Sequence, residues 1–117
     1  MSTKPSLDDL SALEVAQMLK KHEILLVDVR EPDEFAAERI PGALLYPLST
    51  FDAAALPPDS PRRVVFQCGS GKRSAIAARA RLDAGAKHVA HLAGGIGAWK
   101  AAGLPTLRLD PSTGKPA

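Results

Sequence analysis

The sequence predicts an α/β domain in which helices cover both faces of a mostly parallel central sheet, a three-layer α/β/α arrangement. Short apolar runs alternate along the chain with helical segments, an order typical of βαβ units. These runs are continuous in apolar residues, as in strands that are buried on both faces. The chain has 117 residues, of which 45% are hydrophobic and 24% charged, and this suits one domain with its own core.

The first part of the chain provides two helices and one strand of this pattern. Residues 11–20 are predicted to form a helix because Ser11 and Glu14 have the spacing of a capping box and apolar residues recur along one face. The run EILLVDV, residues 23–29, predicts a buried strand. A second, short helix is expected over residues 32–38, since it starts at a proline and acidic residues follow in its first turn.

The middle of the chain continues the alternation. A Pro-Gly turn precedes a short strand that is expected at residues 44–46. Residues 49–62 are polar and contain several prolines, so they are expected to form a connection with one helical turn. The run RRVVFQC, residues 62–68, predicts a third strand. An alanine-rich helix is expected over residues 72–83, with Gly85 as its C-terminal stop.

The last part of the chain completes the domain. The run KHVAHL, residues 87–92, predicts a fourth strand, and a glycine turn and a short helix that contains the core residue Trp99 are expected after it. The glycines of this turn do not have the spacing of a dinucleotide-binding motif, and they are expected to pack close to the loop after residue 68. They are Gly94, Gly95 and Gly97. Residues 1–109 are therefore predicted to be a single domain, whereas residues 110–117 have nothing to bury and are expected to form a disordered tail.

The only cysteine, Cys68, ends the strand predicted at residues 62–68. Sites in parallel sheets form at the carboxyl ends of strands. The residues that follow are Gly69, Ser70, Gly71, Lys72, Arg73 and Ser74. Two glycines let several backbone N–H groups point inward, and the N-terminus of the next helix and two cations add positive charge.

Each of these features favours a thiolate over a thiol. Such surroundings lower the pKa of a cysteine from about 8.5 to roughly 3.5–7.5. We therefore expect Cys68 to be an anionic nucleophile at neutral pH without a histidine base. A buried structural cysteine is the alternative, since free cysteine is often buried. A structural cysteine does not require several inward-pointing N–H groups around its sulfur, so a functional role for Cys68 is favoured.

Three stretches resemble the signatures of the rhodanese domain family, and the resemblance covers nearly the whole chain. They are VDVREPDEFAAERIPGA at residues 27–43, CGSGKRS at 68–74 and LAGGIGAW at 92–99. The resemblance implies a rhodanese-like fold and a single-domain sulfurtransferase, in which Cys68 accepts a sulfane sulfur from a donor such as thiosulfate. The resulting persulfide then passes this sulfur to an acceptor such as cyanide or a thiol, and no separate cofactor is implied.

The same resemblance assigns roles to further residues. The backbone of residues 69–73 is expected to cradle the transferred sulfur. Arg73 matches the loop-closing arginine of the family, and both Lys72 and Arg73 are expected to attract an anionic donor. Asp28 and Arg30 match a D-x-R motif, and charged groups at strand ends need partners, so these residues are expected to give structural support through an ion pair or loop-anchoring hydrogen bonds.

The chain departs from the family pattern at two positions of the first signature. The family usually reads Gly-His-Ile-Pro-Gly-Ala, and this chain has Glu38 and Arg39 in the first two places. The usual histidine is neither the nucleophile nor its base, so sulfur transfer is still expected. The effect of Arg39 on local packing and on the approach of a substrate is left open.

Loop spacing separates the candidate chemistries. Four residues lie between Cys68 and Arg73, which is the spacing of sulfurtransferase loops, whereas cysteine phosphatases have five. A phosphatase or an arsenate reductase is therefore disfavoured, and a non-catalytic sulfur-carrier or sensor domain is the alternative. The chain has no second cysteine, so a persulfide must be discharged by an external acceptor: a small thiol, a thioredoxin-like protein or a sulfur-carrier protein.

Composition argues against several other partners and sites. The formal net charge of +2 is too small to indicate binding of nucleic acid or of an anionic membrane. No segment resembles a secretory signal or a membrane span, which favours a cytoplasmic location. His88 and His91 would point to opposite faces of their predicted strand, so no metal site is expected.

Overall fold

The computed structural model describes residues 5–56, 62–110, 112–113 and 115. Within these residues the central sheet has five strands in the order β1-β6-β5-β2-β4, and every neighbouring pair is parallel. The strands are β1 (Ser6–Leu10), β2 (Ile24–Asp28), β4 (Leu44–Leu45), β5 (Arg63–Gln67) and β6 (His88–Leu92). The predicted parallel sheet is therefore confirmed.

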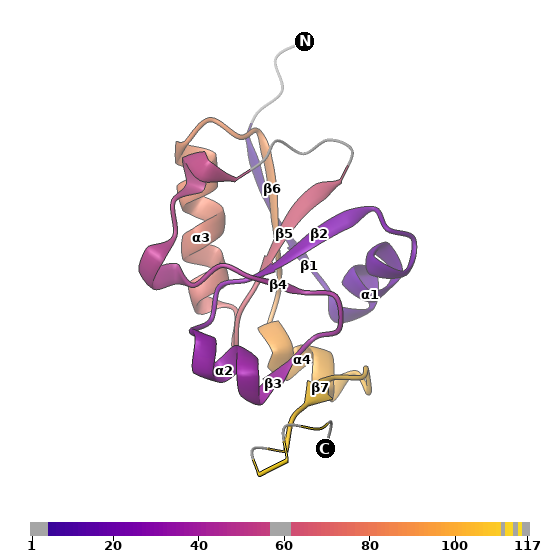
Figure 1. Ribbon diagram of the computed structural model, residues 1–117. Helices are drawn as coiled ribbons and strands as arrows, with labels where there is room; N and C mark the ends of the chain where they lie inside the picture. Colours follow the sequence, from indigo (N-terminus) through magenta and orange to yellow (C-terminus); the bar gives the residue numbers. More distant parts are fainter. Residues whose placement is uncertain (1–4, 57–61, 111, 114, 116–117) are drawn as a thin grey trace.

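Helices cover both faces of this sheet (Figure 1). One face is covered by α3 (Lys72–Asp83), and the other by α1 (Ala12–Lys20) and α4 (Gly95–Ala101). Each face has its own apolar cluster. Val65, Leu92 and Trp99 belong to the cluster beneath α1 and α4, whereas Phe66 and Cys68 belong to the cluster beneath α3. Successive residues of a strand point to opposite faces, which is why neighbouring residues of β5 enter different clusters.

The helix boundaries follow local capping. Ser11 caps α1: its Oγ accepts a hydrogen bond of 3.2 Å from the Glu14 N–H, and the Glu14 carboxylate accepts one of 3.0 Å from the Ser11 N–H. This is the capping box that the sequence predicts. The bounds of α3 are those predicted. The helix α2 (Pro32–Ala37) ends one residue before the predicted end, because the backbone of Glu38 is extended.

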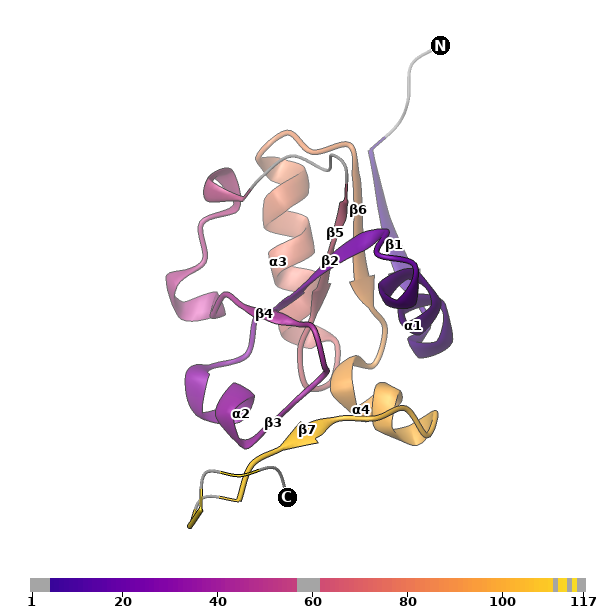
Figure 2. The same ribbon diagram turned by 45° about the vertical axis from the view of Figure 1, so that its right-hand side comes forward.

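Three strands were not predicted. β1 is an edge strand, and its sequence SLDDL carries two carboxylates and lacks the continuous apolar run of the inner strands. The other two are β3 (Glu38–Arg39) and β7 (Leu107–Arg108), which pair antiparallel as a separate small sheet. Figure 2 shows β7 running beside β3 below α4. A strand of two residues is too short to show any period in the sequence.

The connection before β5 contains more helix than expected. Two short 3-10 helices, η1 (Leu48–Thr50) and η2 (Ala53–Ala55), take the place of the single predicted turn. Residues 57–61 of that connection lie outside the described residues, as do several residues of the predicted tail. The disordered tail at residues 110–117 therefore stays a prediction.

The carboxyl ends of the inner strands lie at one edge of the sheet, together with α2 and α4 (Figure 1). β5 ends here at Gln67, and the loop that leads from it to α3 begins with Cys68. This is the edge at which parallel sheets bind their ligands. No helix among the described residues is long and apolar enough to span a membrane.

Candidate active site

The loop between β5 and α3 closes around the sulfur of its own first residue. The Gly71 N–H donates a hydrogen bond of 3.1 Å to the Cys68 Sγ. Gly71 has φ +100°, a left-handed conformation that favours glycine, and this conformation turns the chain into α3 at Lys72. The helix α3 therefore starts directly beside the sulfur, with the positive end of its dipole toward it.

Burial and hydrogen bonding act on the Cys68 thiol in opposite directions. The side chain has no exposed surface, and this burial raises the pKa of Cys68. Hydrogen bonds from the backbone and hydroxyl of Ser74 and from the backbone of Gly71 and Ser70 lower the pKa by more, so that it lies below its usual value. Cys68 thus combines the burial of a structural cysteine with the surrounding hydrogen-bond donors of a reactive cysteine.

Ser74 connects the sulfur to a histidine. Its Oγ lies 3.6 Å from the Cys68 Sγ, and it has two possible acceptors for its proton: the Nδ1 of His91 at 2.8 Å and the Gly71 carbonyl oxygen at 3.2 Å. Both Ser74 and His91 are buried. Ser74 was predicted as a loop residue, whereas His91 was considered only as a metal ligand and given no role.

Arg73 ties the loop to α2. Its Nη1 and Nη2 atoms donate to the two carboxylate oxygens of Glu34 over 2.6 and 2.9 Å. This hydrogen bonding from Arg73 is the main reason that the pKa of Glu34 falls to about 2, and the same pairing raises the pKa of Arg73. The guanidinium is committed to this bidentate contact, so the recruitment of an anionic donor by Arg73 stays a prediction. Lys72, which is exposed, is the other cation of the loop.

The first turn of α4, which contains two glycines of the predicted glycine turn, packs against the loop, as predicted. The Ile96 N–H donates to the Cys68 carbonyl oxygen over 2.8 Å, and the Gly97 N–H donates to the Gly69 carbonyl oxygen over 3.2 Å. A Cβ on Gly95 would overlap the Cys68 carbonyl oxygen and lie 2.7 Å from the Gly69 carbonyl carbon. Only glycine permits this approach of two backbones.

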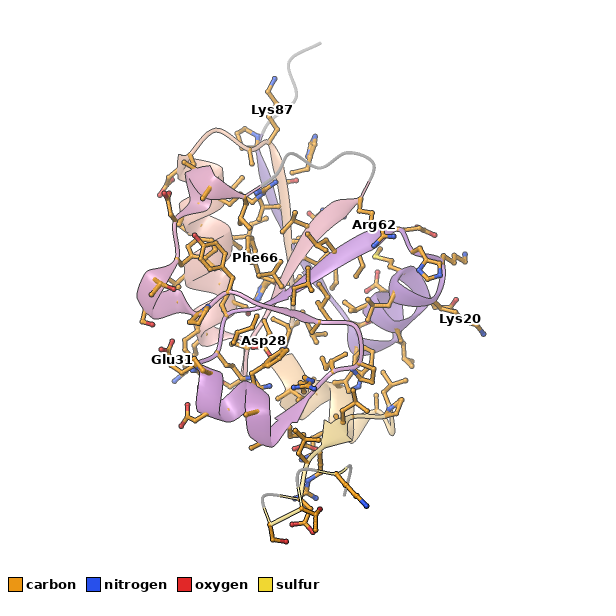
Figure 3. The ribbon with its side chains drawn as sticks, in the orientation of Figure 1. Lys20, Asp28, Glu31, Arg62, Phe66 and Lys87 are labelled. Carbon is orange, nitrogen blue, oxygen red and sulfur yellow. The ribbon has the colours of Figure 1, made fainter. Side chains whose placement is uncertain are left out.

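Asp28 and Arg30 form an ion pair, the first of the two arrangements expected for them, and both are buried. The Arg30 Nη2 donates to Asp28 over 2.9 Å and to the Glu38 carbonyl oxygen over 2.6 Å. Figure 3 shows Asp28 close to α2. The pair thus fastens the end of β2 to β3. In β3, the Arg39 guanidinium lies 4.8 Å from the centre of the Phe35 ring, a cation–π contact at the position of the usual family histidine.

Other parts of the described chain offer less chemistry. A hollow at the amino ends of β2 and β5 has Lys20 and Arg62 among its lining residues, and Figure 3 shows both on the side of the molecule away from α2. The described lining contains no cysteine, serine, threonine or carboxylate side chain. Among the described residues, no group of three or more His, Cys, Asp or Glu side chains is placed to hold a metal ion. His88 bonds Ser6 and His91 bonds Ser74, on opposite faces of β6.

Comparison with known proteins supports one family. A family model described as rhodanese-like domain matches residues 11–102. The chain is 41% identical to the Synechocystis protein slr1261, described as uncharacterized, over 79% of this chain and 51% of that protein, so it spans about half of that relative's length. It is 39% identical to a sulfurtransferase from Allochromatium vinosum, over 73% of this chain and 79% of that protein.

Two further relatives carry more specific names. The thiosulfate sulfurtransferase GlpE from Coxiella burnetii is 32% identical, over 79% of this chain and 86% of that protein. Among solved structures, the thiosulfate sulfurtransferase from Pseudomonas aeruginosa superposes with a TM-score of 0.77 at 32% identity, over 90% of this chain and 20% of that one. The match to the family model, residues 11–102, includes the loop at residues 68–74.

Proposed function

Because the chain belongs to the rhodanese-like domain family, we propose that it transfers a sulfane sulfur from a small anionic donor such as thiosulfate to a nucleophilic acceptor. Cys68 carries the sulfur as a persulfide between the two half-reactions. Cyanide and thiols are the acceptor classes that this chemistry accommodates. The observation that carries the proposal is the cysteine Sγ held by the Gly71 N–H at the floor of a closed loop.

The first half-reaction is a displacement at sulfur. The Cys68 thiolate attacks the outer sulfur of thiosulfate, a new S–S bond forms, and the original S–S bond breaks as sulfite leaves with its electron pair. Hydrogen bonds from Ser74, Gly71 and Ser70 lower the pKa of Cys68, which supports a thiolate as the attacking group. The same donors are positioned to stabilise negative charge on the bound sulfur without reorganising.

The second half-reaction returns the enzyme to its starting state. The acceptor attacks the terminal sulfur of the persulfide, and the Cys68 thiolate leaves as the S–S bond breaks. With cyanide the product is thiocyanate. No other cysteine is present in the 117 residues, so the acceptor must come from outside them: a small thiol, a thioredoxin-like protein or a sulfur-carrier protein.

The dimensions of the loop favour sulfur over a phosphoryl group. Four residues separate Cys68 from Arg73, and the loop N–H of Gly71 already reaches the cysteine sulfur at 3.1 Å. The Arg73 fork, which in a phosphatase must hold phosphoryl oxygens, is occupied by Glu34. Both features support transfer of a single atom.

A steady-state assay tests the proposal. Thiocyanate formation from thiosulfate and cyanide is measured for the wild type and for Cys68→Ala, alongside hydrolysis of an aryl phosphate. The proposal expects saturable thiocyanate formation by the wild type, none by Cys68→Ala and no phosphate release. Phosphate release that depends on Cys68 would instead indicate a phosphatase, and persulfide formation without turnover would indicate a carrier or sensor domain.

A further inference from the structure

A line of hydrogen-bonded side chains runs from the cysteine to the edge of the sheet. The Cys68 Sγ lies 3.6 Å from the Ser74 Oγ, this oxygen lies 2.8 Å from the His91 Nδ1, and the His91 Nε2 lies 2.6 Å from the Asp9 Oδ1. Cys68 begins the loop after β5, and the other three residues come from α3, β6 and β1. In the register of the sheet His91 is paired with Asp9 on β1 and with Phe66 on β5, two residues before Cys68.

We propose that Ser74, His91 and Asp9 form a relay that takes the proton of Cys68 and holds the resulting thiolate ready for sulfur transfer. The relay rests on the proposed function, because it prepares the nucleophile of that reaction. In this arrangement His91 and Asp9 are positioning residues, since they act on the sulfur only through the Ser74 hydroxyl. The loop donors and the relay then stabilise the thiolate together.

The hydrogen-bond geometry sets which atom carries each proton. A carboxylate oxygen can only accept, so the His91 Nε2 carries a proton toward Asp9. With neutral His91, Nδ1 accepts the proton of the Ser74 hydroxyl, and the Ser74 oxygen accepts from the Cys68 thiol. Ser74 Oγ lies closer to Nδ1, at 2.8 Å, than to its other acceptor, the Gly71 carbonyl oxygen, at 3.2 Å.

The transfer from Cys68 to His91 moves two protons and changes no oxidation state. The Cys68 S–H bond breaks as its proton passes to the Ser74 oxygen, while the hydroxyl proton passes to the His91 Nδ1. The result is a thiolate that faces the Ser74 hydroxyl, and an imidazolium that donates to both Ser74 and Asp9. Cys68 is also the leaving group when the persulfide is discharged, so the same hydrogen bond serves both half-reactions.

The charges around His91 favour this arrangement in part. Asp9, the anion in contact with the ring, favours the imidazolium, although its side chain is 70% exposed and its effect is therefore screened. Arg81, the other buried charged residue near this face of the sheet, lies two turns after Ser74 on α3, about 10 Å along the helix axis. The Cys68 thiolate supplies the second negative charge. His88, on the other face of β6, does not face this cluster.

The pH dependence of alkylation by iodoacetamide tests the relay. In His91→Asn the amide can still bond Ser74 but cannot hold the second proton, so the inflection of Cys68 alkylation is expected to move upward by about one pH unit. The wild type is expected to titrate in two steps that belong to the Cys68–His91 pair, and the variant in one. His88→Asn is the matched control, with an expected profile like that of the wild type. An unchanged inflection in His91→Asn overturns the relay.

Two further measurements keep the test decisive if His91→Asn folds poorly. Ser74→Ala removes the link and leaves His91 in place, and it is expected to raise the alkylation inflection by a similar amount. The NMR titration of the His91 ring is expected to shift in Cys68→Ala, because coupling between two sites is reciprocal. A merely structural histidine would titrate identically in the two proteins, and that result overturns the proposal.

The relay and the proposed function fail separately. Alkylation and the NMR titration report proton coupling without any sulfur donor. If the coupling is present and thiosulfate leaves the wild type unmodified, the relay stands and the proposed donor is wrong. If the wild type forms thiocyanate and His91→Asn leaves the pH profile of alkylation unchanged, the proposed function stands and the relay is wrong.

Discussion

Replacing Gly95 by alanine tests whether the glycine turn holds the cysteine loop in place. The added Cβ would overlap the Cys68 carbonyl oxygen and lie 2.7 Å from the Gly69 carbonyl carbon, and both neighbours are backbone atoms. Because backbone cannot rotate away as a flexible side chain does, the turn and the loop must separate. We estimate the separation at roughly 1 Å, since real Cβ atoms do not approach heavy atoms closer than 3.0 Å.

Two terms set the magnitude of the loss in stability. Gly95 has φ +59°, and an L-residue in this left-handed region costs roughly 1–2 kcal/mol. Forcing a methyl group into a packed contact costs a further ~1–3 kcal/mol. The free energy of unfolding is therefore expected to fall by about 2–5 kcal/mol. A displacement of the catalytic sulfur by about 1 Å is also expected to lower the rate of thiocyanate formation by about 100-fold.

Gly103→Ala is the matched control. Gly103 has φ +77°, and a Cβ built on it meets no atom within 4 Å, so only the left-handed term of ~1–2 kcal/mol applies. Urea unfolding and thiocyanate formation are measured for both variants. Equal losses of stability and unchanged rates in the two variants would contradict this prediction, because they would show that the close contact with Cys68 and Gly69 contributes neither to stability nor to activity.

Three further substitutions probe two supports of the site and the N-cap of α1. Glu34→Gln removes the carboxylate paired with Arg73. After allowance for solvent screening, we expect the wild type to be more stable than the variant by about 1 kcal/mol above pH 4.5. This difference should vanish as the pH falls toward about 2, because Glu34 is then protonated. Urea unfolding across this range checks it, and a difference that grows on acidification would contradict the sign. Asp28→Asn leaves the buried Arg30 charge uncompensated and is expected to cost ~3–5 kcal/mol in urea unfolding; a loss below about 1 kcal/mol would mean that the carbonyl contact of Arg30 suffices. Ser11→Ala removes the cap of α1 and is expected to lower stability by ~1 kcal/mol, with recovery in Ser11→Thr; equal thermal midpoints for all three proteins would argue against the cap.

Much of the fold follows from local sequence signals. The helix over residues 72–83 has the predicted bounds because both signals for it are local: an alanine-rich composition within the helix and Gly85 just after its end. The inner strands are continuous apolar runs and are found close to where they are predicted. β1 was missed because its carboxylates, Asp8 and Asp9, resemble a polar connection. Both bond residues distant in sequence, Arg63 and His91, so the reason for placing carboxylates there is visible only in the folded chain.

The cysteine loop and its contact with the glycine turn were predicted from sequence, and its side-chain partners were not. Cys68 and the loop stand together in the chain, so composition and spacing identify them. Arg73 and Glu34 are separated by 39 positions, and His91 lies 17 positions from Ser74. Pairing them requires the order of the strands, which no local pattern contains. An acidic residue in the first turn of the short helix at the same sheet edge was the available signal for Glu34.

The central claim is that Cys68 carries one sulfur atom between donor and acceptor. Intact-protein mass spectrometry tests it most directly, on the wild type and on Cys68→Ala, after brief treatment with thiosulfate and again after cyanide. We expect that only the wild type gains the mass of one sulfur atom and that cyanide then removes this sulfur as thiocyanate. A wild type that gains no sulfur from thiosulfate or from a persulfide donor, or a Cys68→Ala variant that gains the same mass, would contradict it.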